Sequence, residues 1–412
     1  MKIFFVDIKR DINKSYDDLI EDLNELKGIN KYIFENNPYN VVLKIIQSLI
    51  LGSEVELIDS DLSETEINNI GLNYSKINYS TIPCNINITD IKNLYDEIEK
   101  NKLNWKLTLY TSGTTGRPKK VTHNFDTMNR TTRIGDKWAN DIWAYAYNPT
   151  HYAGLQVLFQ AFLNKNSLIY IFDSNFKDIS KVFLKYQITN ISATPTFYRN
   201  AIHFFSEHIE SVKRVTSGGE KFDSSLIGNI KNVFPYSKIN NVYASTEAGS
   251  LFASKGDIFV IRDDIKDYVQ INDEGELLIH KKLLGESDIF DNSIWYNTGD
   301  IVQLVSDNEF VFVSRKTEMI NVGGYKVNPY EVEDEIKKIK GVVDVIVKPR
   351  NNSVTGNILS AEVLLSDGIS KEDIELVIVN SLNSKLQSWK VPRLIKFVNI
   401  IDKTRTGKKV RK

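Results

Sequence analysis

Residues 110–120 read Tyr-Thr-Ser-Gly-Thr-Thr-Gly-Arg-Pro-Lys-Lys, a stretch rich in hydroxyl groups, glycines and lysines. Small residues let backbone N–H groups approach a polyphosphate, and hydroxyl and ammonium groups add further hydrogen-bond donors. The stretch is not a Walker A loop, because Pro118 stands where that pattern requires its second glycine. An ordinary hairpin turn is the alternative for such a composition. We predict a phosphate-binding loop formed by Thr111, Ser112, Gly113, Thr114, Thr115, Gly116 and Lys119.

Four further segments combine small residues with acidic or basic ones: 217–220 (Ser-Gly-Gly-Glu), 243–247 (Tyr-Ala-Ser-Thr-Glu), 296–300 (Tyr-Asn-Thr-Gly-Asp) and 402–408 (Asp-Lys-Thr-Arg-Thr-Gly-Lys). A carboxylate oxygen such as that of Glu247 is a ligand that Mg²⁺ prefers. An ionised Asp300 can accept hydrogen bonds from two hydroxyl groups. Taken singly, each segment has an ordinary explanation: a Gly-Gly turn, a helix start, an Asx turn, or a basic tail that contacts RNA or anionic lipid.

Taken together and in this order, the loop and these segments resemble the motifs of the adenylate-forming enzymes. This superfamily includes acyl-CoA synthetases, peptide-synthetase adenylation domains and luciferases. Residues 314–333 extend the match, because they are similar to the hinge of the family and the start of its C-terminal domain. The similarity begins near residue 105, and the stretch before the phosphate loop is shorter than is usual in the family. We therefore expect a trimmed N-terminal subdomain.

The resemblance implies roles in catalysis for several side chains. Thr246 would contact the α-phosphate of ATP, and Glu247 would bind Mg²⁺. Asp300 would accept hydrogen bonds from the ribose hydroxyls, while Arg315 would face the ribose and the phosphates. Lys408 would bridge the carboxylate and the α-phosphate.

The resemblance also implies the surroundings of the adenine and the acyl group. Adenine would lie against Gly218, Gly219 and Glu220. Tyr243 and Ala244 complete the cofactor-binding segment, and Ala244, where the family usually has glycine, would narrow the neighbouring acyl pocket. That pocket would also include residues of a segment that is similar to the family's His-x-x-Gly sequence, namely His151, Tyr152 and Gly154. Here His151 would gate the tunnel for the thiol.

The hinge and the thiol tunnel are implied by residues 314–333. Thr317 aligns with the hinge position, where family members often carry Asp or Lys, and Ser314 replaces a usual glycine. Gly323 and Gly324 resemble the loop of CoA ligases that lines the pantetheine tunnel. At the tail, Asp402 departs from the usual proline. Residues 275–277 (Gly-Glu-Leu) match a structural motif, for which we expect no chemistry.

These similarities predict a two-step ligase that uses ATP, Mg²⁺ and CoA. A small carboxylic acid would form an acyl-adenylate with release of pyrophosphate, and the small domain would then rotate about Thr317 so that a thiol attacks the adenylate. The Gly323-Gly324 pattern favours CoA as the acceptor. A carrier-protein phosphopantetheine that is loaded in trans is the alternative, and a non-catalytic nucleotide-binding relative belongs to a different class. The identity of the acid is not read from any motif.

The composition restricts the class of protein. The chain has 412 residues and a formal net charge of −1, which argues against a nucleic-acid binder. Its single cysteine, Cys84, permits no intrachain disulfide. No apolar stretch is long enough to span a bilayer. We expect a cytoplasmic enzyme, for which a homodimer is one possible assembly.

The elements that must position these residues alternate between helix and strand. Helical patterns run from Ser15 to Gly28 and from Val41 to Gly52, and strands are predicted at residues 55–58, 167–172 and 188–193. This alternation predicts an α/β fold, with a large N-terminal domain of mixed parallel sheets and helices over residues 1–316. Further helices after Asn328 and Ser370, with strands at 342–347 and 394–398, predict a small, mobile α+β C-terminal domain over residues 317–412.

Overall fold

The computed structural model describes residues 2–77, 81–111, 119–220, 222, 225–288, 290, 293–322, 325–352, 356–402 and 409–411. Contacts divide the chain into two compact units. The first comprises Met1–Val269 and Ile279–Tyr296, and the second comprises Gln270–Leu278 and Asn297–Lys412. Each unit has its own hydrophobic core. The predicted border at residue 317 lies inside the second unit, and a rotation at that point stays a prediction.

The first unit is built around a large, mostly parallel sheet. In spatial order its strands are β15 (Ile258–Val260), β14 (Gly249–Lys255), β13 (Lys238–Ser245), β12 (Arg214–Gly218), β11 (Asn190–Ala193), β9 (Ile142–Tyr145), β10 (Ser167–Tyr170), β1 (Ile3–Asp7) and β2 (Ile12–Ser15). Strands β13 to β1 run parallel to their neighbours. The pairs β13–β14, β14–β15 and β1–β2 are antiparallel.

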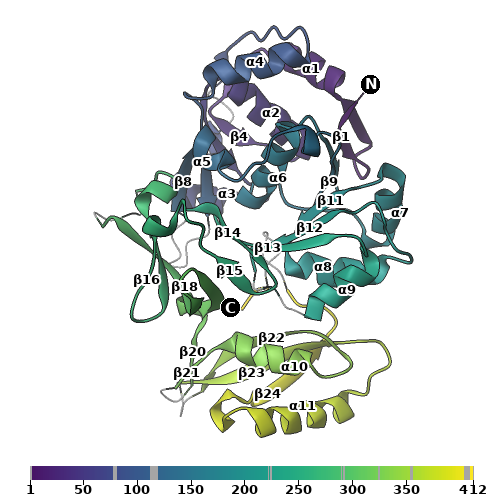
Figure 1. Ribbon diagram of the computed structural model, residues 1–412, viewed down its shortest axis with the longest axis vertical. Helices are drawn as coiled ribbons and strands as arrows, with labels where there is room; N and C mark the ends of the chain where they lie inside the picture. The colour runs from purple at the N-terminus through teal and green to yellow at the C-terminus, as the bar shows by residue number, and fades with distance from the viewer. Residues whose placement is uncertain are drawn as a thin grey trace. The chain divides into compact units, whose positions relative to one another are not determined.

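Helices cover both faces of this sheet, as parallel strands require. On one face lie α7 (Phe176–Tyr186), α8 (Pro195–Ala201) and α9 (Ser225–Val233), which share a buried core with the strands. Figure 1 shows α8 and α9 beside β12 and β13. The helix that follows β9 covers the other face, which places the end of β9 between two layers of helices.

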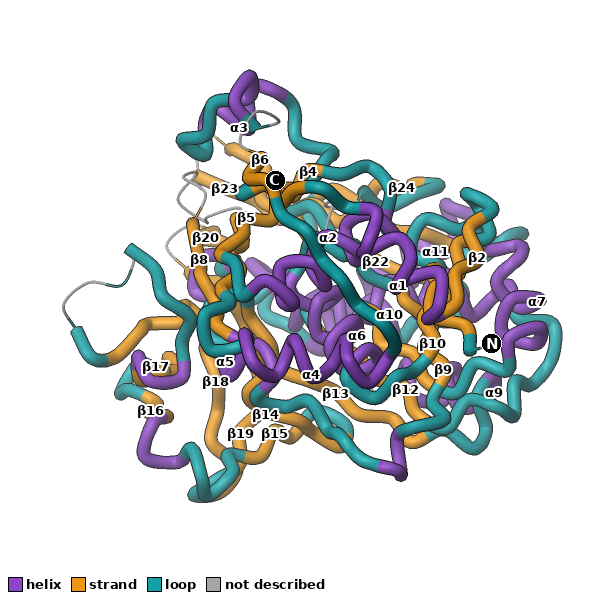
Figure 2. Tube along the Cα trace, turned by 90° about the horizontal axis from the view of Figure 1, so that it is seen from above, coloured by secondary structure: helices purple, strands orange, loops and turns teal. Residues whose placement is uncertain are grey.

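A second, smaller sheet of the first unit carries the predicted phosphate loop. Its strands are β4 (Tyr32–Phe34), β5 (Glu54–Ile58), β7 (Lys106–Thr111) and β8 (Lys119–Asn124). The first three run parallel, and β7 and β8 form an antiparallel hairpin. Between this sheet and the large one lie α1 (Tyr16–Glu25), α2 (Pro38–Leu51), α4 (Ile91–Asn101) and α6 (Tyr152–Phe162). Figure 2 shows α2 and α6 between β5 and β8 on one side and β9 and β10 on the other.

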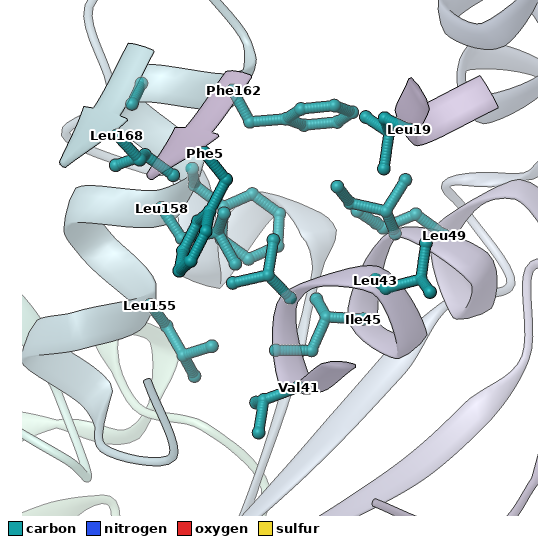
Figure 3. Close-up of a cluster of buried hydrophobic side chains, with 14 of the residues drawn as sticks. Phe5, Leu19, Val41, Leu43, Ile45, Leu49, Leu155, Leu158, Phe162 and Leu168 are labelled. Carbon is teal, nitrogen blue, oxygen red and sulfur yellow. The ribbon is translucent and has the colours of Figure 1, made fainter. Parts of the chain in front are cut away.

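The core between the two sheets is made of aromatic and branched aliphatic side chains. Figure 3 shows Phe5 of β1, Leu19 of α1, Ile45 of α2 and Leu158 of α6 pointing toward one another, and all four are buried. Burying a side chain of this size stabilises the fold by about 1.5–3 kcal/mol. Cys84 packs against the same core, and its Sγ lies 3.6 Å from Nε2 of Gln47.

Local signals explain where the helices begin. Ser15 and Asp18 form a capping box at the start of α1, as the sequence predicts. Helix α2 begins with Pro38 after Asn37 and ends at Gly52, whose φ of 58° is left-handed. The prediction that the first helix extends to Gly28 is wrong, because α1 ends at Glu25 and Gly28 opens a strand.

Shorter elements connect these layers in the first unit. They are β3 (Gly28–Asn30), β6 (Thr81–Pro83), α3 (Glu64–Asn69), η1 (Tyr74–Lys76), α5 (Phe125–Asn129), η2 (Asp136–Trp138), η3 (Ile202–Phe204), η4 (Lys266–Tyr268) and η5 (Lys281–Leu283). Three strands, β16 (Val269–Ile271), β17 (Glu276–His280) and β18 (Trp295–Ser306), have residues in both units.

After the stretch Gln270–Leu278, the second unit continues with a hairpin and ends in a small α+β domain. Strand β18 pairs with β19 (Glu309–Arg315), followed by η6 (Lys316–Glu318), β20 (Ile320–Val322) and β21 (Tyr325–Val327). The small sheet has the order β22 (Val342–Asn352), β23 (Gly356–Leu365) and β24 (Leu394–Val398), and it shares a core with α10 (Pro329–Lys337) and α11 (Lys371–Lys385). Figure 1 shows α10 and α11 beside these strands, with η7 (Ser388–Lys390) before β24.

The architecture confirms the predicted α/β class with a small C-terminal α+β domain. The strands expected at 167–172 and 188–193 are present but shorter, and the strand expected at 394–398 has those bounds. Within the described ranges, no helix has the length and apolar character that a membrane span requires.

Candidate functional site

The phosphate loop lies at the tip of the β7–β8 hairpin. The last paired residues before the tip are Thr111 and Lys119, and the next pair is Tyr110 with Lys120. Five residues assigned to phosphate binding lie outside the described part of the chain, namely Ser112, Gly113, Thr114, Thr115 and Gly116. The sequence therefore places the loop where two hydrogen-bonded strands hold both of its ends.

A buried carboxylate holds this hairpin close to its tip. Glu56 of β5 accepts a hydrogen bond from the hydroxyl of Tyr110, and its Oε1 lies 3.0 Å from Nζ of Lys120 and 3.2 Å from Nζ of Lys31. Burial alone would raise the pKa of Glu56, but the hydrogen bonds from Tyr110 and the two lysines lower it below its usual value. We call Glu56, Tyr110, Lys120 and Lys31 the hairpin clamp.

The segment with the predicted catalytic pair, Thr246 and Glu247, is held through three of its own consecutive backbone carbonyls, each of which is contacted by a donor from elsewhere in the fold. Nε2 of His123 lies 2.7 Å from the carbonyl oxygen of Thr246. The carbonyl of Glu247 accepts from the N–H of Gly285 at 2.8 Å, and that of Ala248 accepts from Arg130 at 3.2 Å. We call residues 246–248 the catalytic segment.

His123 is buried beneath the catalytic segment and is neutral. Burial lowers its pKa to about 4, and the opposing effects of the Thr246 carbonyl and the Glu247 carboxylate are smaller. Because a carbonyl can only accept, Nε2 of His123 carries the proton. Nδ1 then faces the hydroxyl of Thr127 at 3.3 Å.

The segment assigned to the acyl pocket begins helix α6. Tyr152 is buried, with its ring 5.2 Å from that of His123, and an ideal Cβ on Gly249 would lie 2.5 Å from the Tyr152 hydroxyl. A Cβ on Gly154 would lie 2.2 Å from the carbonyl oxygen of Asn148, so glycine is required there. Tyr152 and Gly154 thus pack against the backbone, and their role in an acyl pocket stays a prediction.

His151 precedes α6 and faces an acidic residue. Its Nε2 lies 3.2 Å from Oδ2 of Asp59, which follows strand β5. Asp59 also accepts from the side-chain amide of Asn148 at 3.3 Å. The contact joins the predicted pocket segment to the sheet that carries the phosphate loop.

The segments assigned to adenine lie side by side at the ends of parallel strands, where ligands bind in open α/β sheets. Gly218, the last residue of β12, is paired with Val242 of β13, next to Tyr243. The register of β13 shifts between Tyr243 and Ala244, and such bulges often occur beside active sites. Gly219 follows with a φ of 82°.

Glu220 anchors the neighbouring helix rather than pointing to solvent. Its Oε2 accepts from the N–H of Thr196 at 3.1 Å and from the Thr196 hydroxyl at 2.6 Å. Arg199 lies 3.8 Å from the same oxygen. Thr196 and Arg199 belong to α8, so Glu220 fixes the start of that helix beside the adenine segment.

Glu247, the predicted Mg²⁺ ligand, contacts Tyr296, the first residue of the 296–300 motif, and both residues lie in the first unit. The hydroxyl of Tyr296 donates to Oε1 of Glu247 at 3.3 Å. Among the described residues, no group of three or more His, Cys, Asp or Glu side chains is arranged to hold a metal. A single protein carboxylate fits Mg²⁺, which is usually held by one or two carboxylates together with waters and substrate phosphates.

Two predicted nucleotide residues meet in the second unit. Asp300 and Arg315 face each other across β18 and β19, and Nε of Arg315 donates to Oδ1 of Asp300 at 2.8 Å. The Asp300 side chain is 6% exposed. Its backbone N–H donates to the hydroxyl of Thr298, which itself donates to the carbonyl of Leu277.

Glu276, in the motif for which we expected no chemistry, supports this turn. Its Oε1 accepts from the N–H of Gly299 at 3.0 Å, where φ is 75°. Its Oε2 lies 3.3 Å from Asn297 and 3.3 Å from Nζ of Lys316. Glu276 therefore holds the residues on both sides of the Asp300–Arg315 pair.

The basic tail is bound to the small domain just after the segment that contains Lys408, and the two ends of that segment are bonded to each other. The N–H of Val410 donates to the carbonyl of Asp402 at 3.0 Å. Lys409 pairs with Asp344 at 2.5 Å, and Arg411 pairs with Glu333. Burial alone would lower the pKa of Arg411, but Glu333 raises it above its usual range. We call these contacts the tail clasp.

The remaining site predictions fall in or beside segments without a structural description. Lys408, Gly323 and Gly324 lie outside the described residues, as does the side chain of Lys119. Thr317 lies in η6, next to Glu318, which accepts a hydrogen bond from Tyr330 at 2.5 Å.

The sequence analysis missed the supporting residues His123, Arg130 and Glu56, whereas Glu276 stands in the motif that was expected to be structural. Glu56 carries a signal, because it stands between apolar residues of β5 and a buried polar group needs a partner. The partners of the missed residues are far away in the sequence, and no local pattern identifies them.

Comparison with known proteins places these features in a family. The model for the AMP-binding enzyme matches residues 90–284, and the model for the AMP-binding enzyme C-terminal domain matches residues 331–408. A 2-succinylbenzoate–CoA ligase of Staphylococcus aureus is 23% identical over 385 residues, which cover 86% of this chain and 75% of that protein. Bacitracin synthase 3 of Bacillus licheniformis is 24% identical over 349 residues, which cover 74% of this chain and only 5% of that protein.

A solved structure shares the fold over the whole chain. It is an o-succinylbenzoate CoA synthetase of Bacillus subtilis in complex with its acyl-adenylate intermediate, with a TM-score of 0.71 and 17% identity, covering 100% of this chain and 94% of that one. The same synthetase has also been solved with ATP and a magnesium ion. The order of motifs, the two matching family models and the shared fold agree. The chain therefore belongs to the AMP-binding enzymes, the adenylate-forming superfamily of acyl-CoA synthetase-like ligases.

Proposed function

We propose that this enzyme activates a carboxylic acid with ATP and then transfers the acyl group to the thiol of CoA. In the first step a carboxylate oxygen attacks the α-phosphorus and the bond to pyrophosphate breaks, which gives an acyl-adenylate. In the second step the thiolate attacks the acyl carbon and AMP leaves. CoA ligases among the relatives support this acceptor.

Residues of the first unit would bind and orient the phosphates in the first step. Thr246 contacts the α-phosphate, and the hairpin loop with Lys119 holds the β- and γ-phosphates. Glu247 would hold Mg²⁺, which neutralises phosphate charge when bound. Oriented donors of this kind act where charge develops, and losing one typically costs about 10²–10³ in rate.

Residues of the second unit would bind the ribose and complete the catalytic group. Asp300 accepts from the ribose hydroxyls while Arg315 orients its carboxylate and faces the phosphates. Lys408 bridges the carboxylate and the α-phosphate. For the second step, the small domain rotates about Thr317, and Gly323 and Gly324 line the path of the thiol. Such domain motions often limit turnover.

The observation that carries the proposal is the contact between Tyr296 and Glu247. It joins two motifs that are 49 residues apart in the sequence at one carboxylate oxygen. The oxygen is a suitable ligand for a hard cation, and both motifs belong to the same adenylation chemistry in the family.

A carrier-protein phosphopantetheine is the second candidate acceptor. The similarity to a segment of bacitracin synthase 3 supports it, because adenylation domains of peptide synthetases belong to the same superfamily. An acyl carrier would then be a partner in trans. A homodimer is a further prediction that depends on neither acceptor.

Carboxylate-dependent exchange of radioactive pyrophosphate into ATP tests the first step. We expect exchange with at least one member of a panel of aryl, dicarboxylic, short-chain and amino acids, including 2-succinylbenzoate. Products formed with CoA or with a phosphopantetheine-loaded carrier then distinguish the two acceptors.

Glu247→Gln is the variant that tests the predicted Mg²⁺ ligand, because it keeps the shape of the side chain and removes its charge. It should lower the exchange rate by about 10²–10³. Binding of Mg·ATP without exchange for any acid would contradict the proposed ligase and favour a non-catalytic nucleotide-binding protein.

A further inference from the structure

Three neighbouring peptide groups of the catalytic segment are each fixed by a different part of the fold. Their donors are the imidazole of His123 in β8, the N–H of Gly285 and the guanidinium of Arg130. A peptide carbonyl that is held in this way fixes the rotation of the peptide plane. The side chains that flank each plane are fixed with it.

His123 is the buried side chain among these donors that contacts the carbonyl of Thr246. Its side chain is buried, its ring contacts Tyr152, and its protonated Nε2 points at the Thr246 carbonyl at 2.7 Å. The other ring nitrogen faces Thr127. The imidazole therefore lies between the catalytic segment and the start of α5, and it cannot turn without breaking both contacts.

Arg130 and Gly285 provide the other two contacts to the catalytic segment. One nitrogen of Arg130 donates to Ala248 at 3.2 Å and to Leu283 at 2.9 Å, so it joins the catalytic segment to η5. A Cβ on Gly285 would lie 2.8 Å from the Thr122 carbonyl and 3.0 Å from the His123 ring. Glycine is required for Gly285 to approach both the catalytic segment and β8.

We propose that His123 is a positioning residue that holds the Thr246 peptide, with Arg130 as its counterpart at Ala248, so that Thr246 and Glu247 present their side chains to Mg·ATP. The inference rests on the proposed function only for the identity of the ligand. Residues that orient metal ligands from behind typically change metal affinity or activity by about 10–100-fold when they are replaced.

A pair of amide variants separates the hydrogen bond from the size of the side chain. His123→Gln places an amide N–H near the position of Nε2, whereas the shorter His123→Asn places it near Nδ1. We expect His123→Asn to raise the Mg²⁺ concentration for half-maximal exchange by about 10–100-fold. His123→Gln should restore that value to within a few-fold of the original enzyme, since it keeps the donor.

The Mg²⁺ dependence of exchange is a measurement that would stay unchanged if His123 only stabilised the fold. The burst of adenylate counts competent active sites, and the Mg²⁺ dependence is measured for those sites alone. Ser48→Ala is the control, because it removes an acceptor for Nε1 of Trp105 in the same core and touches no residue of the catalytic segment. It should lower the unfolding temperature without changing the Mg²⁺ requirement.

Two results would overturn the inference. One is an unchanged Mg²⁺ requirement in folded His123→Asn enzyme, and the other is a His123→Gln variant as defective as His123→Asn. If His123→Asn does not fold, Arg130→Lys gives the same readout at Ala248, and an unchanged Mg²⁺ requirement there would also reject the support. Calorimetric titration with Mg·ATP compares nucleotide binding by the variants even if no acid supports exchange. A failure of the ligase proposal can therefore be distinguished from a failure of the positioning role of His123.

Discussion

The buried carboxylates among the candidate site residues and their supporting residues each have a hydrogen-bond or ion-pair partner that fixes their orientation. Arg315 holds one oxygen of Asp300, Glu276 holds the turn before it, and Glu56 holds the phosphate hairpin close to its tip. A buried carboxylate without such partners would be costly. These pairs therefore set the direction of each functional group before any nucleotide binds.

The Asp300–Arg315 pair leads to a prediction about the sugar. The original enzyme should prefer ATP to 2′-deoxy-ATP, because a hydrogen bond to a charged group contributes about 1.5–3 kcal/mol, or roughly 10–100-fold. Asp300→Asn should raise KM for ATP and lose most of this preference. Exchange rates with both nucleotides measure it.

The comparison between nucleotides removes the effect of general damage. A variant that is merely less stable loses activity with ATP and 2′-deoxy-ATP equally. If Asp300→Asn keeps the full preference, Asp300 does not bind the ribose.

The role of a single residue was predictable when the residue belongs to a recognisable motif. It was not predictable when the role depends on a partner far away in the sequence. Glu247, Asp300 and Arg315 stand in recognisable motifs, and the structure brings Asp300 and Arg315 together. His123 and Thr246 are 123 positions apart, and Glu56 and Lys120 are 64 apart. Only the folded arrangement of β5, β7 and β8 creates those contacts.

The β7–β8 hairpin is the element that presents the phosphate loop, and the hairpin clamp ties it to β5. Glu56→Gln should lower the free energy of unfolding by about 1–2 kcal/mol, a reduced value because Lys31 and Lys120 are half-exposed. It should also raise KM for ATP, because Lys120 belongs to the hairpin. Urea unfolding and the ATP dependence of exchange measure the two effects.

Lys31→Met is the matched control for the hairpin clamp. Lys31 contacts the same carboxylate oxygen as Lys120 but precedes β4 and lies outside the hairpin. Its loss should change stability and leave KM for ATP unaltered. Equal changes of KM in both variants would show that the clamp acts only on stability.

Elements with local signals were predicted, and their ends were predicted less well. The capping box of α1 and the glycine after α2 are local and were correct. The end of α1 was wrong because Gly28 pairs with Pro83 in β3 and β6, a contact that competes with the helix. Pairing of that kind joins segments more than fifty positions apart and leaves no periodic pattern.

At the scale of the whole molecule, the two half-reactions should depend on different parts of the second unit. Lys408→Ala should lower adenylate formation by about 10²–10³, because one charge-stabilising group is lost. It should spare thioester formation from acyl-adenylate that is supplied directly. Pre-steady-state measurement of each half-reaction tests this.

Lys371→Ala, a change at an exposed lysine at the start of α11, is the control and should alter neither step. Equal losses in both half-reactions of Lys408→Ala would contradict a cycle in which the small domain alternates between two positions.

The overall plan was predictable from alternating helices and strands, whereas the contacts that form the two compact units are not visible in the sequence. The second unit takes in β19 and a stretch from 270 to 278 that the sequence does not mark with any linker. Contacts made by Glu276 with Gly299 and Lys316 hold that stretch to the hairpin. The amino-acid composition of the chain does not reveal such contacts.

The tail clasp attaches residues 409 and 411 to the small domain. Lys408 is one residue from Lys409, so their Cα atoms are about 3.8 Å apart. Lys409 is paired with Asp344, at the start of β22. Arg411 is paired with Glu333 of α10, so the end of the tail is attached to a strand and to a helix of the small domain. If the small domain rotates as predicted, the tail should move with it as one body, so one rotation would change the position of every residue of the tail.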